Sequence, residues 1–174
     1  MTTKISIKKL TLCALFAALT AVMSQLLIPI GPIPINLAML SVFVAGGLLG
    51  SSAAALSQTV YVLMGAVGLP VFAMLTGGIG IVLGPTGGYI IGYIAAAWLI
   101  GLIVTKTSRT FFNLVLAMIT GLVLCYTLGT AWFMVVTKNA LIESLMMCVV
   151  PFLIGDALKI AAAAFLVKRL QRFV

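Results

Sequence analysis

The strongest constraint on the fold of this chain is a series of apolar runs, most of them long enough to cross a lipid bilayer. The runs cover about residues 10–30, 37–50, 53–69, 79–104, 111–136 and 145–167. Since a helix needs about 20 apolar residues to span the hydrocarbon core, the first, fourth, fifth and sixth runs each qualify. We therefore predict an all-α integral membrane protein, a single domain of residues 1–174 built as a six-helix transmembrane bundle.

Two boundaries of these runs need separate arguments. The break between the second and third runs depends on glycines and serines at 46–52, which favour a turn without supplying charge, and a single bent segment is the alternative. The first run follows three lysines, as the apolar region of a signal peptide does. Because this run is too long for a signal peptide and further spans follow, we predict that it is a retained first span.

The composition excludes an ordinary water-soluble domain. Only 7% of the residues are charged, against about 25% in a typical globular domain, and 64% are hydrophobic. The formal net charge of +8 does not predict a nucleic-acid partner, because the cations flank apolar runs and form no basic face interleaved with aromatic residues. Membrane lipid is the predicted surrounding. The three cysteines are expected to be small core residues.

The absence of histidine removes most zinc-site and catalytic-triad chemistry, and we predict neither a metal site nor a cofactor. ATP binding by a phosphate loop is also excluded, because that loop needs Gly-Lys-Ser/Thr and no glycine here precedes a lysine. The chain is therefore not expected to hydrolyse ATP itself.

The cations predict the orientation of the bundle, since cytoplasmic loops carry the excess of Lys and Arg. With six spans, Lys138 lies on one side, and eight cations lie on the other: Lys4, Lys8, Lys9, Lys106, Arg109, Lys168, Arg169 and Arg172. Both termini are therefore predicted to be cytoplasmic. An odd number of spans would place the first and last basic clusters on opposite sides.

The connection at about 69–84 is predicted to face outward and to fold into the bundle. It is too apolar for a solvated loop and too rich in glycine and proline for a helix. Irregular backbone at membrane depth is tolerated where protein buries it or where it lines a cavity. This segment is the main candidate for a cavity lining.

Asp156 and Lys159 are the principal candidates for a polar site inside the membrane. They are three residues apart in the last run, so a helix places both side chains on one face. Each charge costs about 2.5–3.5 kcal/mol at the centre of a span, so the pair should face the bundle interior. It either bridges two helices or binds a polar solute, and we favour the second interpretation. Glu143, the other acidic residue, lies near the outer end of this run.

The first run contains two overlapping Ala-x-x-x-Ala patterns, formed by Ala14, Ala17, Ala18 and Ala21. Small residues at this spacing permit close contact between helices. The contact is either internal or with a partner protein, and Ala14 and Ala18 are the candidate docking residues.

Three stretches of the sequence are distinctive: Ile28-Pro-Ile-Gly-Pro-Ile-Pro34, the pair Gly68-Leu-Pro-Val-Phe72 and Leu83-Gly-Pro-Thr-Gly-Gly-Tyr89, and Pro151-Phe-Leu-Ile-Gly-Asp-Ala-Leu-Lys159. Through these stretches the chain resembles a known family, the BioY-type biotin-binding S components of energy-coupling-factor (ECF) vitamin transporters. The resemblance implies an outward-facing biotin site in a multi-pass protein of the prokaryotic plasma membrane. It also implies that the first helix docks on a transmembrane coupling subunit and that two partner ATPases supply the energy.

The same resemblance implies the ligand contacts Thr76, Gly77, Gly78, Tyr89, Asp156 and Lys159. The chain departs from some relatives, which have a side-chain amide at position 76, a basic residue at position 90, or Thr and Gln near positions 36–38. Without a basic residue in place of Ile90, the ligand carboxylate would be held by Lys159, by backbone amides near Gly87 and Gly88, or by water.

Biotin fits the residues that the sequence offers. Its ureido N–H groups suit Asp156, its carbonyl or carboxylate suits Lys159, and its apolar parts suit Phe72, Met74 and Tyr89. We favour the ureido ring deep in the site, because Asp156 lies about eleven residues, or roughly 16 Å of helix, into the last run.

Three alternatives stay open at this point. An S component for riboflavin or thiamin would need more aromatic residues than the site region offers. A membrane-embedded enzyme using Asp156 and Lys159 as acid and base would need a further nucleophile or metal. A structural membrane protein would leave the glycine-rich connection unexplained.

Overall fold

The computed structural model describes residues 6–28 and 34–173. Lys4 and most of the connection from Pro29 to Asn36 lie outside the described residues. The helices are α1 (Ile7–Gln25), α2 (Ala38–Leu49), α3 (Ser51–Ala66), α4 (Ile79–Leu83), α5 (Gly87–Lys106), α6 (Phe111–Thr137), α7 (Leu141–Cys148) and α8 (Leu153–Leu170). Short 3-10 turns lie at Ala73–Leu75 and Val150–Phe152. The strands β1 (Leu27–Ile28) and β2 (Ile35–Asn36) pair antiparallel.

Within residues 6–28 and 34–173, four segments are long and apolar enough to cross a membrane, namely α1, α5, α6 and the segment from Leu141 to Leu170. The helices from the second and third runs are shorter, with 12 residues in α2 and 16 in α3. They are separate helices that meet at Gly50, whose φ of 79° is a conformation that residues with side chains rarely adopt. The all-α prediction is confirmed within the described residues, apart from the two-residue strands.

Three predicted boundaries differ from the structure. The first run leaves the helix after Gln25 and continues as β1. The fourth run begins as the short helix α4, and its long helix α5 starts only at Gly87. The sixth run is interrupted at Val150–Phe152 because Pro151 has no N–H group to continue the helix. The last segment is therefore two helices joined by a 3-10 turn and not one continuous helix.

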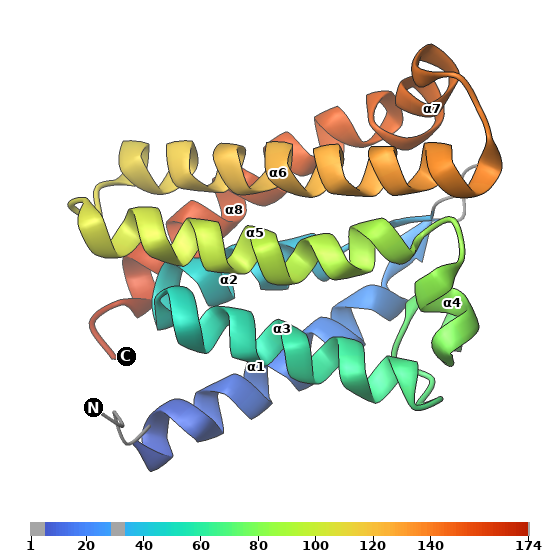
Figure 1. Ribbon diagram of the computed structural model, residues 1–174. Helices are drawn as coiled ribbons and strands as arrows, with labels where there is room; N and C mark the ends of the chain where they lie inside the picture. The colour runs from blue at the N-terminus through green and yellow to red at the C-terminus, as the bar shows by residue number, and fades with distance from the viewer. Residues whose placement is uncertain (1–5, 29–33, 174) are drawn as a thin grey trace.

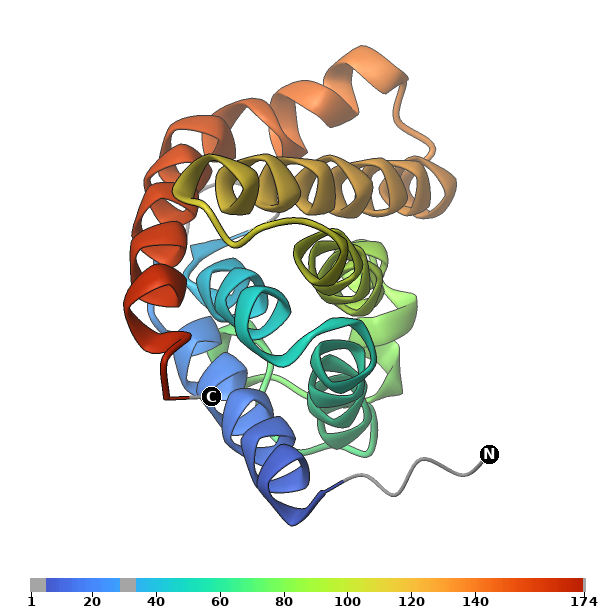
Figure 2. The same ribbon diagram turned by 90° about the vertical axis from the view of Figure 1, so that its left-hand side faces the viewer.

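Helix α2 occupies the centre of the bundle. Of its residues, all but Leu40 are buried, and it packs against α1, α3, α5 and α8, as the view along the helices shows (Figure 2). Close approach depends on small residues: a Cβ atom on Gly46 would lie 2.8 Å from Ile100, and one on Gly47 would lie 2.6 Å from Val167. The apolar residues of α2 are thus shielded from lipid by its neighbours.

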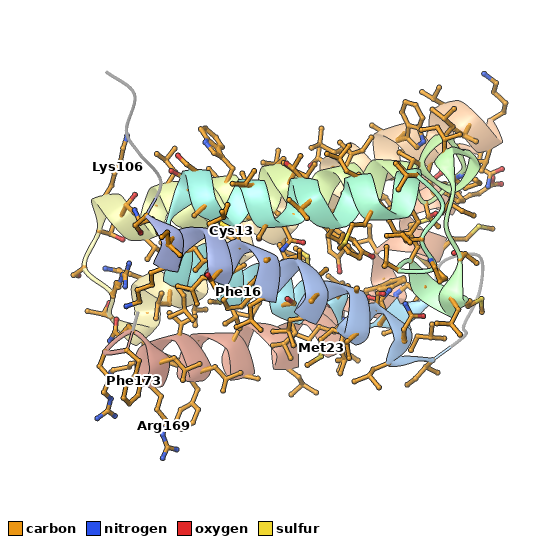
Figure 3. The ribbon with its side chains drawn as sticks, turned by 90° about the horizontal axis from the view of Figure 1, so that it is seen from below. Cys13, Phe16, Met23, Lys106, Arg169 and Phe173 are labelled. Atoms are coloured by element: carbon orange, nitrogen blue, oxygen red, sulfur yellow. The ribbon has the colours of Figure 1, made fainter. Side chains whose placement is uncertain are left out.

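Both ends of the described chain lie at the same end of the bundle, whereas α4 and α7 lie at the opposite end (Figure 1). Lys8 Nζ donates to the backbone carbonyl of Phe173 at 3.3 Å and so links the two ends. Lys106 and Arg169 also lie at this end (Figure 3). The cations are therefore concentrated at one end, as the counting of loop charges predicts.

A small polar cluster, which we call the core cluster, joins α1, α2 and α3 inside the bundle. Thr20 Oγ1 and Ser41 Oγ are 2.9 Å apart, and Gln58 Nε2 donates to Thr20 Oγ1 at 3.2 Å. All three residues are at most 1% exposed. Gln58 Oε1 has no hydrogen-bond partner among the described residues.

Candidate functional site

A cavity of about 240 Å³ lies in the half of the bundle that contains α4 and α7. Its walls come from α2, α3, α5, α6 and α8 and from the connection between α3 and α5. Small-molecule pockets usually measure about 300–1,000 Å³, so this cavity suits a small solute. Its apolar lining residues include Met39, Phe72, Met74, Ile81, Ile90, Leu122 and Phe152.

Asp156 and Lys159 are charged residues of the lining, and together with Tyr126 they form a group that we call the cavity cluster. Lys159 Nζ donates to Asp156 Oδ1 at 2.6 Å, and the hydroxyl of Tyr126 donates to Asp156 Oδ2 at 2.5 Å. Asp156 is 3% exposed and Lys159 is 7% exposed. Both oxygens of the carboxylate therefore have a donor, and the buried ion pair adds no net charge to the cavity.

The break at Pro151 determines where Asp156 lies. Because α8 starts at Leu153, Asp156 is in the first turn of that helix and not deep in a continuous one. A carboxylate is favoured there, since the N-terminal end of a helix carries a partial positive charge. As predicted, the side chains of Asp156 and Lys159 lie on the same face of α8. The predicted depth of 16 Å along an unbroken helix was wrong, because the helix is interrupted.

Aromatic side chains line much of the cavity: Tyr61, Phe72, Tyr89, Tyr93, Tyr126 and Phe152. The rings of Tyr61 and Phe72 meet edge to face with centroids 5.6 Å apart, and Tyr61 and Tyr93 are 6.4 Å apart. The prediction that the site region offers few aromatic residues was wrong. The tyrosines come from α3, α5 and α6, which are far apart in the sequence. Only the packing of these three helices brings their rings to one cavity.

Four of the six predicted ligand contacts line the cavity, namely Thr76, Tyr89, Asp156 and Lys159. Thr76 Oγ1 donates to the carbonyl of Ala73 at 2.8 Å, and the hydroxyl of Tyr89 lies 2.9 Å from Thr130 Oγ1. These two hydroxyls are thus oriented by neighbouring groups of the protein. Of the positions at which the sequence departs from relatives, Asn36 and Ile90 also line the cavity.

Gly77 and Gly78 are not among the described residues that line the cavity. A Cβ atom on Gly77 would lie 2.3 Å from the carbonyl oxygen of Leu69, and Gly78 has a φ of 103°. The amide of Gly78 donates to the carbonyl of Gly65 at 2.7 Å. These glycines allow the connection to pack closely against the end of α3. Their role as ligand contacts stays a prediction.

The amides of Gly87 and Gly88 were predicted as one way to hold a ligand carboxylate, but these glycines also lie outside the described lining. A Cβ atom on Gly87 would lie 1.7 Å from the carbonyl oxygen of Val82, and one on Gly88 would lie 2.3 Å from Trp132. Both glycines permit close packing. Thr86, the preceding residue, is the one that lines the cavity.

The two alanine patterns of α1 lie on neighbouring faces of the helix, about 60° apart, and differ in burial. Ala14 and Ala18 are exposed on the outside of the bundle. Ala17 is 1% exposed and, with Ala21, packs in the core. The structure therefore leaves one small-residue face of α1 uncovered and buries the other.

These features place the chain in the class of membrane-embedded helical proteins that enclose a solute-sized cavity. The comparison with known families gives a closer identification. The chain belongs to the BioY family, whose family model matches residues 1–174.

Relatives support the family over nearly the full length of the chain. The probable biotin transporter BioY of Pyrococcus horikoshii is 38% identical and covers 94% of this chain, with 96% of its own length matched. The biotin transporter BioY of Thermotoga maritima is 35% identical and covers 95% of this chain, with 96% of its own length matched. These relatives are named as transporters and not as enzymes.

A solved structure shares the fold. It is the S-component for biotin from an ECF-type ABC transporter, and its TM-score against this chain is 0.90 at 31% sequence identity. The match covers 100% of this chain and 96% of the other. The bundle described above is therefore the S-component fold.

Proposed function

We propose that this protein is the biotin-binding S component of an ECF transporter, which captures biotin from the outward side of the membrane. The observation that supports this most directly is the cavity cluster, a buried acid–base pair in a small apolar cavity. The names of the relatives, which are biotin transporters, support the ligand.

The charges of the cavity favour one orientation of biotin. The ureido ring is neutral and has N–H donors and a carbonyl acceptor, so it matches Asp156 and Lys159 without adding charge to the buried pair. A carboxylate placed beside Asp156 would add a second negative charge and weaken the binding. We therefore place the ureido ring at the cavity cluster and the carboxylate towards Asn36 and Thr86, which offer polar side chains to the lining.

Direct binding tests the ligand. Radiolabelled biotin should bind the purified chain in detergent, and an excess of unlabelled biotin should displace it. Biotin methyl ester should compete nearly as well as biotin if the carboxylate lies away from the pair, whereas an analogue without the ureido group should not compete. Displacement by riboflavin or thiamin but not by biotin would assign the site to another vitamin.

We propose that α1 docks on a transmembrane coupling subunit that is associated with two ATPase subunits. The uncovered alanine face supports this, because only small side chains allow another helix to approach closely. Replacing Ala14 or Ala18 with Trp should weaken assembly with the coupling subunit and leave biotin binding by the isolated chain intact. Loss of both properties together would assign these alanines to internal packing.

The orientation follows from the concentration of cations at the end where the chain begins and ends. We propose that both termini face the cytoplasm of a prokaryotic cell and that the cavity opens towards the outside. Reporter fusions before Thr2 and after Val174 test this, and an outward signal from either fusion would contradict it.

A further inference from the structure

One irregular segment covers the cavity from the side of α1. We call residues 71–76 the cap, and four of them, Phe72, Ala73, Met74 and Thr76, line the cavity. The cap contains one short 3-10 turn, and Met74 and Leu75 have φ values of 61° and 55°. Both values are unfavourable for residues with side chains. The cap therefore needs contacts from outside itself to keep its conformation.

Two adjacent side chains at the end of α1 provide those contacts. Ser24 Oγ lies 2.6 Å from the carbonyl oxygen of Val71 and 2.7 Å from that of Ala21, so its one proton is shared between the two acceptors. Gln25 Nε2 donates to the carbonyls of Val71 at 3.2 Å and Phe72 at 2.9 Å, and Gln25 Oε1 accepts from the amide of Leu75 at 2.9 Å. Gln25 thus satisfies backbone donors and acceptors at both ends of the turn.

The remaining hydrogen bonds of the cap are local. Within the described part of the chain, the amide of Val71 bonds to Leu69, and the amide of Phe72 bonds to the carbonyl of Thr76. The Phe72 ring packs closely on Gly65, where a Cβ atom would lie 2.0 Å from it. Since irregular backbone in an apolar surrounding needs a partner for each polar group, the side chains of α1 are the main polar attachment of the cap.

We propose that Ser24 and Gln25 form a latch that holds the cap over the cavity and sets the rate at which biotin enters and leaves. They are positioning residues, because neither belongs to the cavity lining and both act through the backbone of the cap. The proposal rests on the proposed function for the identity of the ligand, but the latch itself is a property of the protein without ligand.

The decisive variant is Gln25→Met, which keeps the length of the side chain and removes three hydrogen bonds to the cap. The dissociation rate of biotin should rise about ten- to hundredfold, where tenfold corresponds to about 1.4 kcal/mol. The association rate should rise as well, since the same opening admits the ligand. Gln25→Glu retains an acceptor for the amide of Leu75 but has no donor for the carbonyls of Val71 and Phe72. Biotin should therefore dissociate from this variant at least as fast as from Gln25→Met.

Two controls separate the latch from general effects of substitution. Gln171→Met makes the same change near the C-terminus, at the opposite end of the bundle from the cap. Thr127→Val removes an exposed hydroxyl that, among the described residues, bonds only within α6, and it serves as a control for Ser24→Ala. Both controls should leave the rates within twofold of the wild-type values.

Amide hydrogen exchange of a peptide covering residues 69–78 tests the latch without ligand. Exchange of this peptide should be faster in Gln25→Met than in the wild type, while exchange of peptides from α5 and α6 stays unchanged. If Gln25→Met does not fold, Ser24→Ala takes its place, with the same expected result. A folded variant with unchanged exchange in the cap would overturn the proposal, and so would a dissociation rate within twofold of wild type. If the wild-type chain does not bind biotin, the proposed function fails, and the exchange result still decides the latch.

Discussion

The core cluster and the cavity cluster are both buried polar groups in an apolar bundle, yet they differ in what surrounds them. Thr20, Ser41 and Gln58 lie between packed helices, and none of them lines the cavity. Tyr126, Asp156 and Lys159 lie between α6 and α8, and all three line it. The core cluster is neutral, whereas the cavity cluster contains an ion pair.

The difference shows that burial of polar groups does not by itself identify a binding site. Interhelical hydrogen bonds in membrane proteins contribute modestly to stability, on average about 0.6 kcal/mol, so the core cluster is sufficiently explained by packing. A buried ion pair is a poor way to gain stability, because desolvation of the charges offsets their attraction. A charged pair that also borders an empty space is better explained by a ligand.

The largest expected effect is that of removing one member of the ion pair. Lys159→Met leaves Asp156 buried without its cation, which should lower the free energy of unfolding by roughly 3–5 kcal/mol. Biotin binding should be lost in the same variant. Thermal unfolding in detergent and equilibrium binding measure the two effects, and an unchanged melting temperature would show that the pair is not held in a dry environment.

Removing both charges separates a binding site from a structural bridge. In Asp156→Asn with Lys159→Met no unpaired charge is left, so much of the lost stability should return. Binding should stay about ten- to hundredfold weaker, because each charged hydrogen bond to the ligand contributes about 1.5–3 kcal/mol. Affinity close to wild type in the folded double variant would make the cavity cluster a structural feature like the core cluster.

Tyr126→Phe is expected to have an intermediate effect. It removes the O–H donor to Asp156 Oδ2 and leaves the ion pair intact. The carboxylate then loses part of its orientation, and biotin affinity should fall about three- to tenfold, or roughly 0.6–1.4 kcal/mol. Thr127→Val, at the next position of α6, is the matched control. A loss of stability without a change in affinity would argue that Tyr126 only packs.

The smallest effect is expected in the core cluster. Gln58→Met removes two amide hydrogen bonds but also removes the carbonyl oxygen that has no partner among the described residues. These contributions oppose each other, so the free energy of unfolding should change by less than about 1 kcal/mol. The dissociation constant of biotin should stay within twofold of wild type. A tenfold weaker affinity would extend the site into the core cluster.

The sequence predicted the parts of this protein that depend on short-range chain geometry. Hydropathy identified the membrane class, because the length of an apolar run can be compared with the thickness of the bilayer. The spacing of Asp156 and Lys159 placed both side chains on one face of a helix, and in the structure Lys159 Nζ lies 2.6 Å from Asp156 Oδ1. The motifs around Gly68, Pro85 and Pro151 indicated the family, which the comparisons confirm.

Contacts between residues far apart in the chain were decided only by the tertiary structure. Tyr61, Tyr93 and Tyr126 gave no separate signal, since tyrosine in an apolar helix equally suits lipid-facing and core positions. Likewise, the sequence did not show that Gln25 reaches the backbone of residues 71–75, about fifty positions later. An apolar helix shows little contrast between its faces, so the packing of its neighbours determines which face lines a cavity.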